Sequence, residues 1–163
     1  AISKYWITKR APYLVFEALE CHGGPGYIEE SIMPRLYREA PLNSIWEGSG
    51  NVMCLDVLRA LQRDKNALPS LFRELASAKG SNKNFDESFS HLKDTLQDPI
   101  DLEIEARLLT EKMACLIQAS IFIKSGEEEK VSAFCNSRLG PRWSGAFGTL
   151  PTDTSFEYIM GGL

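Results

Sequence analysis

Apolar residues recur along most of the chain at the three- and four-residue spacing of an amphipathic helix. No convincing strand alternation and no internal repeat is present. Seven segments follow the helical pattern, with approximate bounds 2–22, 34–38, 51–63, 69–79, 84–96, 98–125 and 127–138. We therefore predict an all-α fold in which antiparallel helices form a bundle.

Prolines and glycines set the expected limits of these helices. Pro12 lacks a backbone donor and should disturb the first helix, and the glycine-rich run at 23–26 should end it. The segment 39–50 is expected to be irregular. Glycines and prolines break any periodicity in 139–163, which predicts a coil tail after a single helical domain, 1–138.

Two helix starts carry cap signals, and one helix has an unusually wide apolar face. Asn84 and Glu87 resemble a capping box, while Asp98 and Pro99 would supply the N-cap and first turn of the longest helix. The helix at 51–63 leaves only a narrow polar stripe, so we expect it to be buried on most sides.

The composition is that of an ordinary globular domain. The 163 residues are 44% hydrophobic and 25% charged, with a formal net charge of -4 and a pI near 5.3. A disordered chain would hold less apolar material, and no apolar run approaches the roughly 18 residues that a membrane span needs. The acidic balance argues against a general nucleic-acid binder, although it leaves room for a local basic face.

The cysteines indicate neither a metal site nor a disulfide framework. The four thiols form no C-x-x-C pair, and the two histidines lie far apart in the sequence. Reduced thiols in apolar helical stretches suit an intracellular protein, cytoplasmic or mitochondrial. The chain begins at Ala1, within a helical pattern and without an initiator Met or signal peptide, so we expect it to be part of a longer protein.

The connection at 20–51 concentrates the residues most suited to chemistry. Glu47 is a carboxylate next to Trp46 on a glycine-flanked turn, and desolvation by the indole ring would raise its affinity for a proton, as a general base requires. Gly48 and Gly50 would let a ligand approach the backbone, and the N–H groups of the next helix could bind an anion. Local features alone favour a solvated turn residue over a base.

The other candidates in this connection have equally plain alternatives. The run at 23–26 follows a helix and is not G-x-G-x-x-G, so by itself it indicates a helix end rather than a cofactor loop. Arg35 and Arg38 lie three residues apart on one helix face, where a salt-bridged surface is favoured over phosphate recognition.

Three motifs in sequence, however, resemble the C-terminal helical domain of the acyl-CoA dehydrogenase family. They are E-C-H-G-G-P-G-Y at 20–27, P-R-L-Y-R-E-A at 34–40 and I-W-E-G-S at 45–49. The family reads Q-x-x-G-G-x-G-Y, an R-D-A-like element and Y-E-G-T at these places. The sequence of 34–59 resembles most that of the AidB-like branch, which comprises flavoproteins of the adaptive response to alkylating agents. Residues 64–138 add helices compatible with that branch but no further motif.

This resemblance implies a reaction and a set of roles. The reaction is α,β-dehydrogenation of an acyl-CoA thioester, in which Glu47 takes the α-proton and hydride passes to FAD. Glu47 and Gly48 would contact substrate, with the backbone N–H of Glu47 at the thioester carbonyl. Gly23, Gly24 and Glu20 would approach the FAD of a neighbouring subunit in a homodimer or homotetramer. Two further residues, Ser49 and Asn51, would lie near the FAD of the same subunit, and Arg38 would hold the connection.

The sequence departs from the family at three motif positions. Glu20 replaces Gln and places a negative charge near an anionic pyrophosphate, Trp46 replaces Tyr, and Ser49 replaces Thr. The N-terminal helical domain and the middle β-domain of the family are missing, so an isolated C-terminal portion should bind FAD poorly and be inactive.

Two other functions remain open. One is an AidB-like flavoprotein with little turnover that associates with DNA in a protective role, and the other is a non-catalytic helical module that binds acyl ligands or a partner. Candidate DNA contacts are the basic residues Arg59, Arg63, Lys65, Lys79 and Lys83. On composition alone these residues form a solvated face of an acidic protein.

Overall fold

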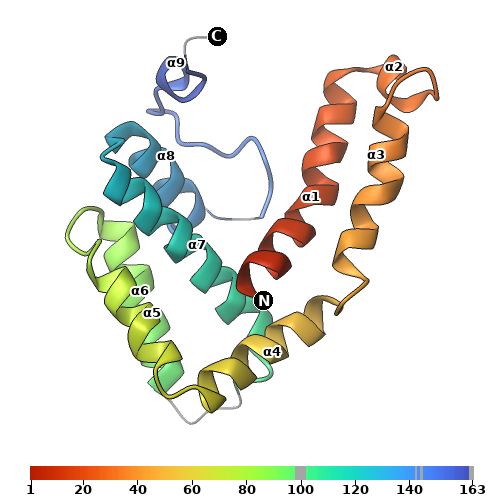
Figure 1. Cartoon of the computed structure of the whole chain (residues 1–163). Coiled ribbons are helices and arrows are strands. Elements are labelled where there is room, and N and C mark those ends of the chain that lie inside the picture. The colour runs from red at the N-terminus through yellow and green to blue at the C-terminus, as the bar shows by residue number, and fades with distance from the viewer. Residues whose placement is uncertain (98–101, 142, 144, 162–163) are drawn as a thin grey trace. The chain divides into compact units, whose positions relative to one another are not determined.

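The computed structural model describes residues 1–97, 102–141, 143 and 145–161, and each regular element in them is a helix (Figure 1). The α-helices are α1 (Ile2–Cys21), α2 (Gly24–Tyr27), α3 (Met33–Glu39), α4 (Gly50–Arg63), α5 (Ala67–Ala76), α6 (Lys83–Gln97), α7 (Ala106–Ser125), α8 (Glu128–Arg138) and α9 (Phe156–Ile159). A 3₁₀ helix, η1 (Ala40–Ser44), follows α3. The all-α prediction is confirmed.

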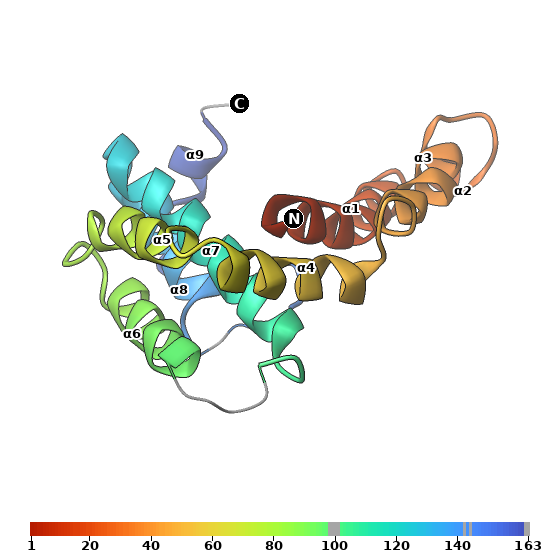
Figure 2. The ribbon, with the colours of Figure 1, turned by 60° about the horizontal axis from the view of Figure 1, so that its bottom comes forward.

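The helices form two compact units. Unit 1 comprises Ala1–Gln62 and Glu103–Glu111, and unit 2 comprises Arg63–Leu102 and Lys112–Leu163. In unit 1, α1 packs antiparallel to α3 and against η1, with α2 closing the far end of the pair. Figures 1 and 2 both show α1 and α3 side by side.

A small polar cluster joins three helices inside unit 1. The Tyr5 hydroxyl of α1 and the Cys54 thiol of α4 share a hydrogen bond, and burial is the main cause that raises the pKa of each group. Cys54 is also hydrogen-bonded to the side chain of Thr110 in α7, which is fully buried and donates its hydroxyl proton to the Ala106 carbonyl at 2.7 Å. This cluster fixes the start of α7 against α1 and α4, because buried polar groups need partners.

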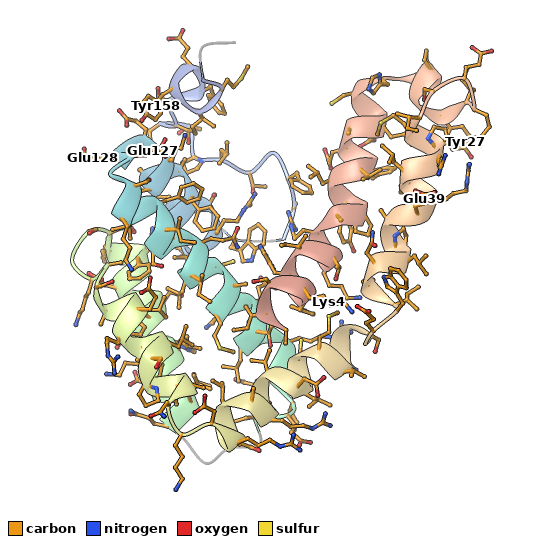
Figure 3. The ribbon with its side chains drawn as sticks, in the orientation of Figure 1. Lys4, Tyr27, Glu39, Glu127, Glu128 and Tyr158 are labelled. Atoms are coloured by element: carbon orange, nitrogen blue, oxygen red, sulfur yellow. The ribbon has the colours of Figure 1, made fainter. Side chains whose placement is uncertain are left out.

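Unit 2 has an aromatic and aliphatic core. Its most buried side chains come from four helices and include Leu75, Phe85, Leu92, Met113, Leu116 and Cys135. The Phe72 and Phe89 rings meet edge to face with centroids 5.9 Å apart, which joins α5 to α6. The tail packs on α8 through α9, and Figure 3 shows Tyr158 at the same end of unit 2 as Glu127 and Glu128.

Short elements and helix starts differ from the sequence prediction. The first helix does end at Cys21 and continues through Pro12, but Gly24–Tyr27 then forms one further helical turn. The segment expected to be irregular contains η1. The residue that caps α6 is Asn82, not Asn84: its side-chain oxygen accepts the Asn84 N–H at 2.9 Å.

The longest predicted helix begins later than expected. Its predicted start at Asp98 and Pro99 lies outside the described residues, and α7 begins only at Ala106. The prediction that α4 is buried on most sides is wrong for this chain. Val52 is 46% exposed, and the buried residues of α4 are Gly50, Met53, Cys54, Val57 and Leu58. None of the described helices has the length and apolar character needed to cross a membrane.

Candidate functional site

Glu47 lies on a tight turn between η1 and α4 that is anchored to α1. The Leu42 carbonyl accepts the N–H groups of Ile45 at 2.9 Å and Trp46 at 3.3 Å. The Lys4 ammonium donates to the Trp46 carbonyl at 2.6 Å. Figure 3 shows Lys4 at the end of α1 that faces the connection between α3 and α4. The turn is therefore held to a helix 42 residues away in the sequence.

The backbone of Glu47 is left-handed, with φ of 57°. Among the described residues it is the only one other than glycine with a positive φ. This conformation costs an L-residue roughly 1–2 kcal/mol, and such strain gathers at functional sites. Within the part of the chain that the structure describes, the Glu47 N–H donates no hydrogen bond, so it is available to an external acceptor.

The residues that the structure describes do not form the apolar enclosure expected around Glu47. Trp46 is 60% exposed, Ile45 is 63% exposed, and Glu47 itself is exposed. Desolvation of the carboxylate therefore requires atoms that the described residues do not supply.

Two cations approach the start of α4. The Asn51 side-chain oxygen accepts the Arg107 Nε–H at 2.6 Å, across 56 residues of sequence. A Cβ at Gly50 would lie 2.7 Å from Lys9 Cε and 3.1 Å from Arg107 Nη2, so the ends of both cationic side chains lie close to this backbone position. The Ser49 carbonyl accepts the Met53 N–H at 2.9 Å, which begins the helical bonding of α4. A cavity of about 200 Å³ adjoins this point.

The second predicted cofactor segment lies at the opposite end of α1. Gly23 has φ of 62°, and a Cβ at Gly23 or Gly24 would meet nothing within 4 Å, so both glycines face open space. Glu20 is exposed beside them. Since α1 rises about 1.5 Å per residue, Glu20 lies about 24 Å along the helix from Lys4, which holds the Glu47 turn. The structure therefore keeps the two segments apart.

Both arginines of α3 form surface salt bridges. Arg35 pairs with Glu39 at 2.9 Å, and Arg38 donates to both carboxylate oxygens of Glu29, at 2.6 and 3.1 Å. Hydrogen bonding to Arg38 lowers the pKa of Glu29. Arg38 therefore ties the loop after α2 to α3. Of the two interpretations of Arg35 and Arg38, the salt-bridged surface is the one that agrees with the structure.

Two of the candidate DNA contacts are engaged in ion pairs along their own helices. Arg59 pairs with Asp56 at 2.6 Å and Lys83 with Glu87 at 3.6 Å. Over the described ranges, no group of three or more His, Cys, Asp or Glu side chains could hold a metal ion.

Sequence reasoning missed the three cations that organise the predicted site. Lys4 holds the Glu47 turn, while Lys9 and Arg107 lie at the start of α4. No motif contains them, and their partners are far away in the sequence, so only the fold brings them there.

The chain was compared with models of known protein families, and one of them matches its first 62 residues. Residues 1–62 match the protein-family model described as "Acyl-CoA dehydrogenase, C-terminal domain". This match ends at the residue that ends the first segment of unit 1, Gln62.

Individual relatives carry related names. The chain is 40% identical, over 86% of its length, to AidB of Escherichia coli (strain K12), whose name assigns it provisionally to the acyl-CoA dehydrogenases. It is 34% identical over 61% of its length to acyl-CoA dehydrogenase family member 11 of Caenorhabditis elegans. It is 33% identical over 46% of its length to 3-methylmercaptopropionyl-CoA dehydrogenase of Ruegeria pomeroyi. These matches span 26%, 16% and 13% of the three relatives.

Proposed function

Because the chain belongs to the acyl-CoA dehydrogenase family and carries its C-terminal domain, we propose that the whole protein is a FAD-dependent oxidoreductase of acyl-CoA thioesters. The reaction is α,β-dehydrogenation, which removes a proton from the α-carbon and a hydride from the β-carbon. When bound, FAD supplies the acceptor for the hydride.

Glu47 is the base in this proposal. Its carboxylate takes the α-proton, and its backbone N–H donates to the thioester carbonyl, where negative charge develops as the proton leaves. The left-handed backbone of Glu47, together with an N–H that has no acceptor among the described residues, is the observation that carries the assignment. Gly48 has φ of 111°, which an L side chain rarely adopts, so glycine at this position lets the chain turn from Glu47 into α4.

The donor groups near α4 fit a phosphate-bearing cofactor. The Ser49 hydroxyl and the Asn51 amide offer hydrogen-bond donors, and Lys9 and Arg107 add positive charge at a helix N-terminus. Glu20 does not fit a phosphate, because a carboxylate has no donor to offer and repels an anion. It does fit a ribityl or ribose hydroxyl, which would donate to it.

Two observations support a homo-oligomer, as a dimer or tetramer. The glycine pair Gly23–Gly24 and the Glu47 turn lie at opposite ends of α1, so they would serve two different flavins, one from a neighbouring subunit. Unit 1 also exposes large apolar side chains, among them Ile7, Tyr13, Leu14, Tyr27, Ile45 and Trp46. Exposed apolar area of this kind marks surfaces that other protein covers.

The test is the Glu47→Gln substitution in the whole protein, which removes the base but keeps the size of the side chain. We expect the variant to retain FAD and to lose acyl-CoA-dependent bleaching of the flavin band, with reduction at least about a hundredfold slower. Glu39→Gln is the matched control, since Glu39 is an exposed carboxylate paired with Arg35 on α3. Anaerobic stopped-flow absorbance with a panel of acyl-CoAs measures both variants. Undiminished reduction by Glu47→Gln would exclude Glu47 as the base.

A further inference from the structure

Arg107 fixes the orientation of a predicted cofactor contact, although it lies outside the family match at 1–62. Its Nε–H donates to the side chain of Asn51 at 2.6 Å. A guanidinium only donates, so the accepting atom must be the Asn51 oxygen, and the carboxamide cannot be rotated the other way. The Asn51 amide nitrogen then points away from Arg107 and finds no acceptor among the described residues.

The surroundings of this amide favour an anionic or acceptor-rich ligand. Arg107 and Asn51 line the cavity of about 200 Å³ beside the start of α4. Lys9 approaches the same point of the backbone, at Gly50. Glu103 is the one carboxylate among the residues that line the cavity, and it is already engaged in an interaction of its own. Two cations and two amide hydrogens thus meet where α4 begins.

We propose that Arg107 is a positioning residue for the cofactor site: it holds the Asn51 carboxamide with both N–H groups outward, toward the phosphate-bearing half of FAD. The inference rests on the proposed function, since FAD is the ligand that the family implies. If Arg107 only joined α7 to α4, its replacement would lower the stability of the fold. It would not change the affinity for FAD through the Asn51 amide.

A double-mutant cycle in the whole protein separates these roles. The dissociation constant of FAD is measured by flavin fluorescence for Arg107→Gln, Asn51→Ala and the double variant. We expect each single variant to bind FAD about tenfold more weakly, since a charge-assisted contact or its partner is lost. The double variant should be about as weak as Arg107→Gln alone, because without Arg107 the Asn51 carboxamide is no longer held toward the ligand and its removal costs little more.

Riboflavin and a control arginine provide the comparison. Riboflavin lacks the phosphates and the adenosine, so its affinity should not change in any of these variants. Arg59→Gln, which removes an exposed arginine of α4 that pairs with Asp56, should leave the affinity for FAD unchanged.

A second substitution keeps the test independent of folding. Asn51→Asp retains the oxygen that accepts the Arg107 bond but removes the two outward N–H groups. We expect this variant to melt at the wild-type temperature or above and to bind FAD at least about tenfold more weakly. Unchanged FAD affinity in Arg107→Gln, or strictly additive effects in the cycle, would overturn the inference alone. A wild-type protein that does not bind FAD would overturn the inference and the proposed function together.

Discussion

At Glu47 the chain places a carboxylate in a backbone conformation that glycine adopts without strain. The strain is local, because Lys4 and the Leu42 carbonyl hold the residues just before Glu47 and α4 begins three residues after it. The turn thus fixes the backbone of Glu47, including the direction of its N–H. The proposed role of Glu47 needs this, because its N–H must meet the thioester carbonyl in one geometry.

The strain at Glu47 can be measured directly. Glu47→Gly should give a higher free energy of unfolding than Glu47→Ala by about 1 kcal/mol, because glycine accepts φ of 57° while alanine retains the clash. Urea denaturation of the chain, followed by circular dichroism, compares the two variants. The same pair at Glu39, the last residue of α3, is the control: its backbone is right-handed with φ of −80°, so alanine should be the more stable there by about 0.5 kcal/mol. Equal stability of the two Glu47 variants would show that the turn changes its backbone conformation and that alanine carries no strain there.

At this scale the sequence identifies candidate residues but not their neighbours. The motif around Glu47 could be found because its residues are contiguous. The contacts of Lys4 with the turn and of Arg107 with Asn51 could not, since they cross 42 and 56 residues and depend on how helices pack. Expecting Trp46 to shield Glu47 failed for a related reason: adjacency in sequence does not place one side chain over the next.

The start of α6 carries a side-chain cap, whereas α1, α3, α5 and α8 begin without one. The Asn82 oxygen accepts the N–H groups of Asn84 and Phe85, at 2.9 and 3.3 Å. Asn84 instead donates its amide to Asn136 of α8, at 2.8 Å. One asparagine therefore begins the helix, and the other joins two helices.

Removing the cap should destabilise unit 2. We expect Asn82→Ala to lower the free energy of unfolding by about 1 kcal/mol, and Asn82→Ser to preserve most of it, since serine also caps. Chemical denaturation of the two variants beside the wild type measures the difference. Equal losses for alanine and serine would show that Asn82 acts through contacts other than the cap.

Burial of the Cys135 thiol in α8 should make stability depend on alkaline pH. Burial raises its pKa to about 11 from an ordinary value of 9.0. Between those two pH values the Cys135 thiol keeps its proton in the folded chain and loses it in the unfolded chain. Rising pH therefore favours the unfolded chain, and the free energy of unfolding falls between pH 9 and 11. The loss is small at pH 9, reaches about 2 kcal/mol at pH 11 and levels off near 3 kcal/mol above it.

The contribution of Cys135 is isolated by comparing variants. Cys135→Ala should be less stable than the wild type at pH 7, because a buried side chain is truncated, but its stability should fall less steeply between pH 9 and 11. Cys21→Ala, which changes an exposed thiol, should follow the wild-type curve. Denaturation midpoints across this pH range give the slopes, and parallel wild-type and Cys135→Ala curves would contradict the assignment.

The length of a helix decides whether the sequence can predict it. Helices of ten residues or more show several periods of apolar spacing, so α1 and α4–α8 could be predicted, although the start of α7 was not. The one-turn helices α2 and α9 and the 3₁₀ helix η1 span four or five residues, too few to show a period.

Unit 1 leaves a large apolar surface uncovered, and the chain spans only 26% of AidB. In α1, Ile7 is 64% exposed and Leu14 is 59% exposed. These residues are seven apart, so they share a helix face. If the whole protein is an oligomer, as proposed, this face is covered either by its other domains or by another subunit.

The chain alone should therefore associate through this face of α1. We expect it to bind the dye ANS and to sediment as a concentration-dependent mixture, because apolar area left in water drives association. The double substitution Ile7→Ser with Leu14→Ser should lower both dye binding and association. Neither side chain lies in the core, so the fold should be kept. Ile121→Ser, which changes a similarly exposed residue of α7, is the control and should have a smaller effect. Sedimentation velocity at several concentrations measures association, and a wild-type chain that stays monomeric without binding ANS would show that this face needs no cover.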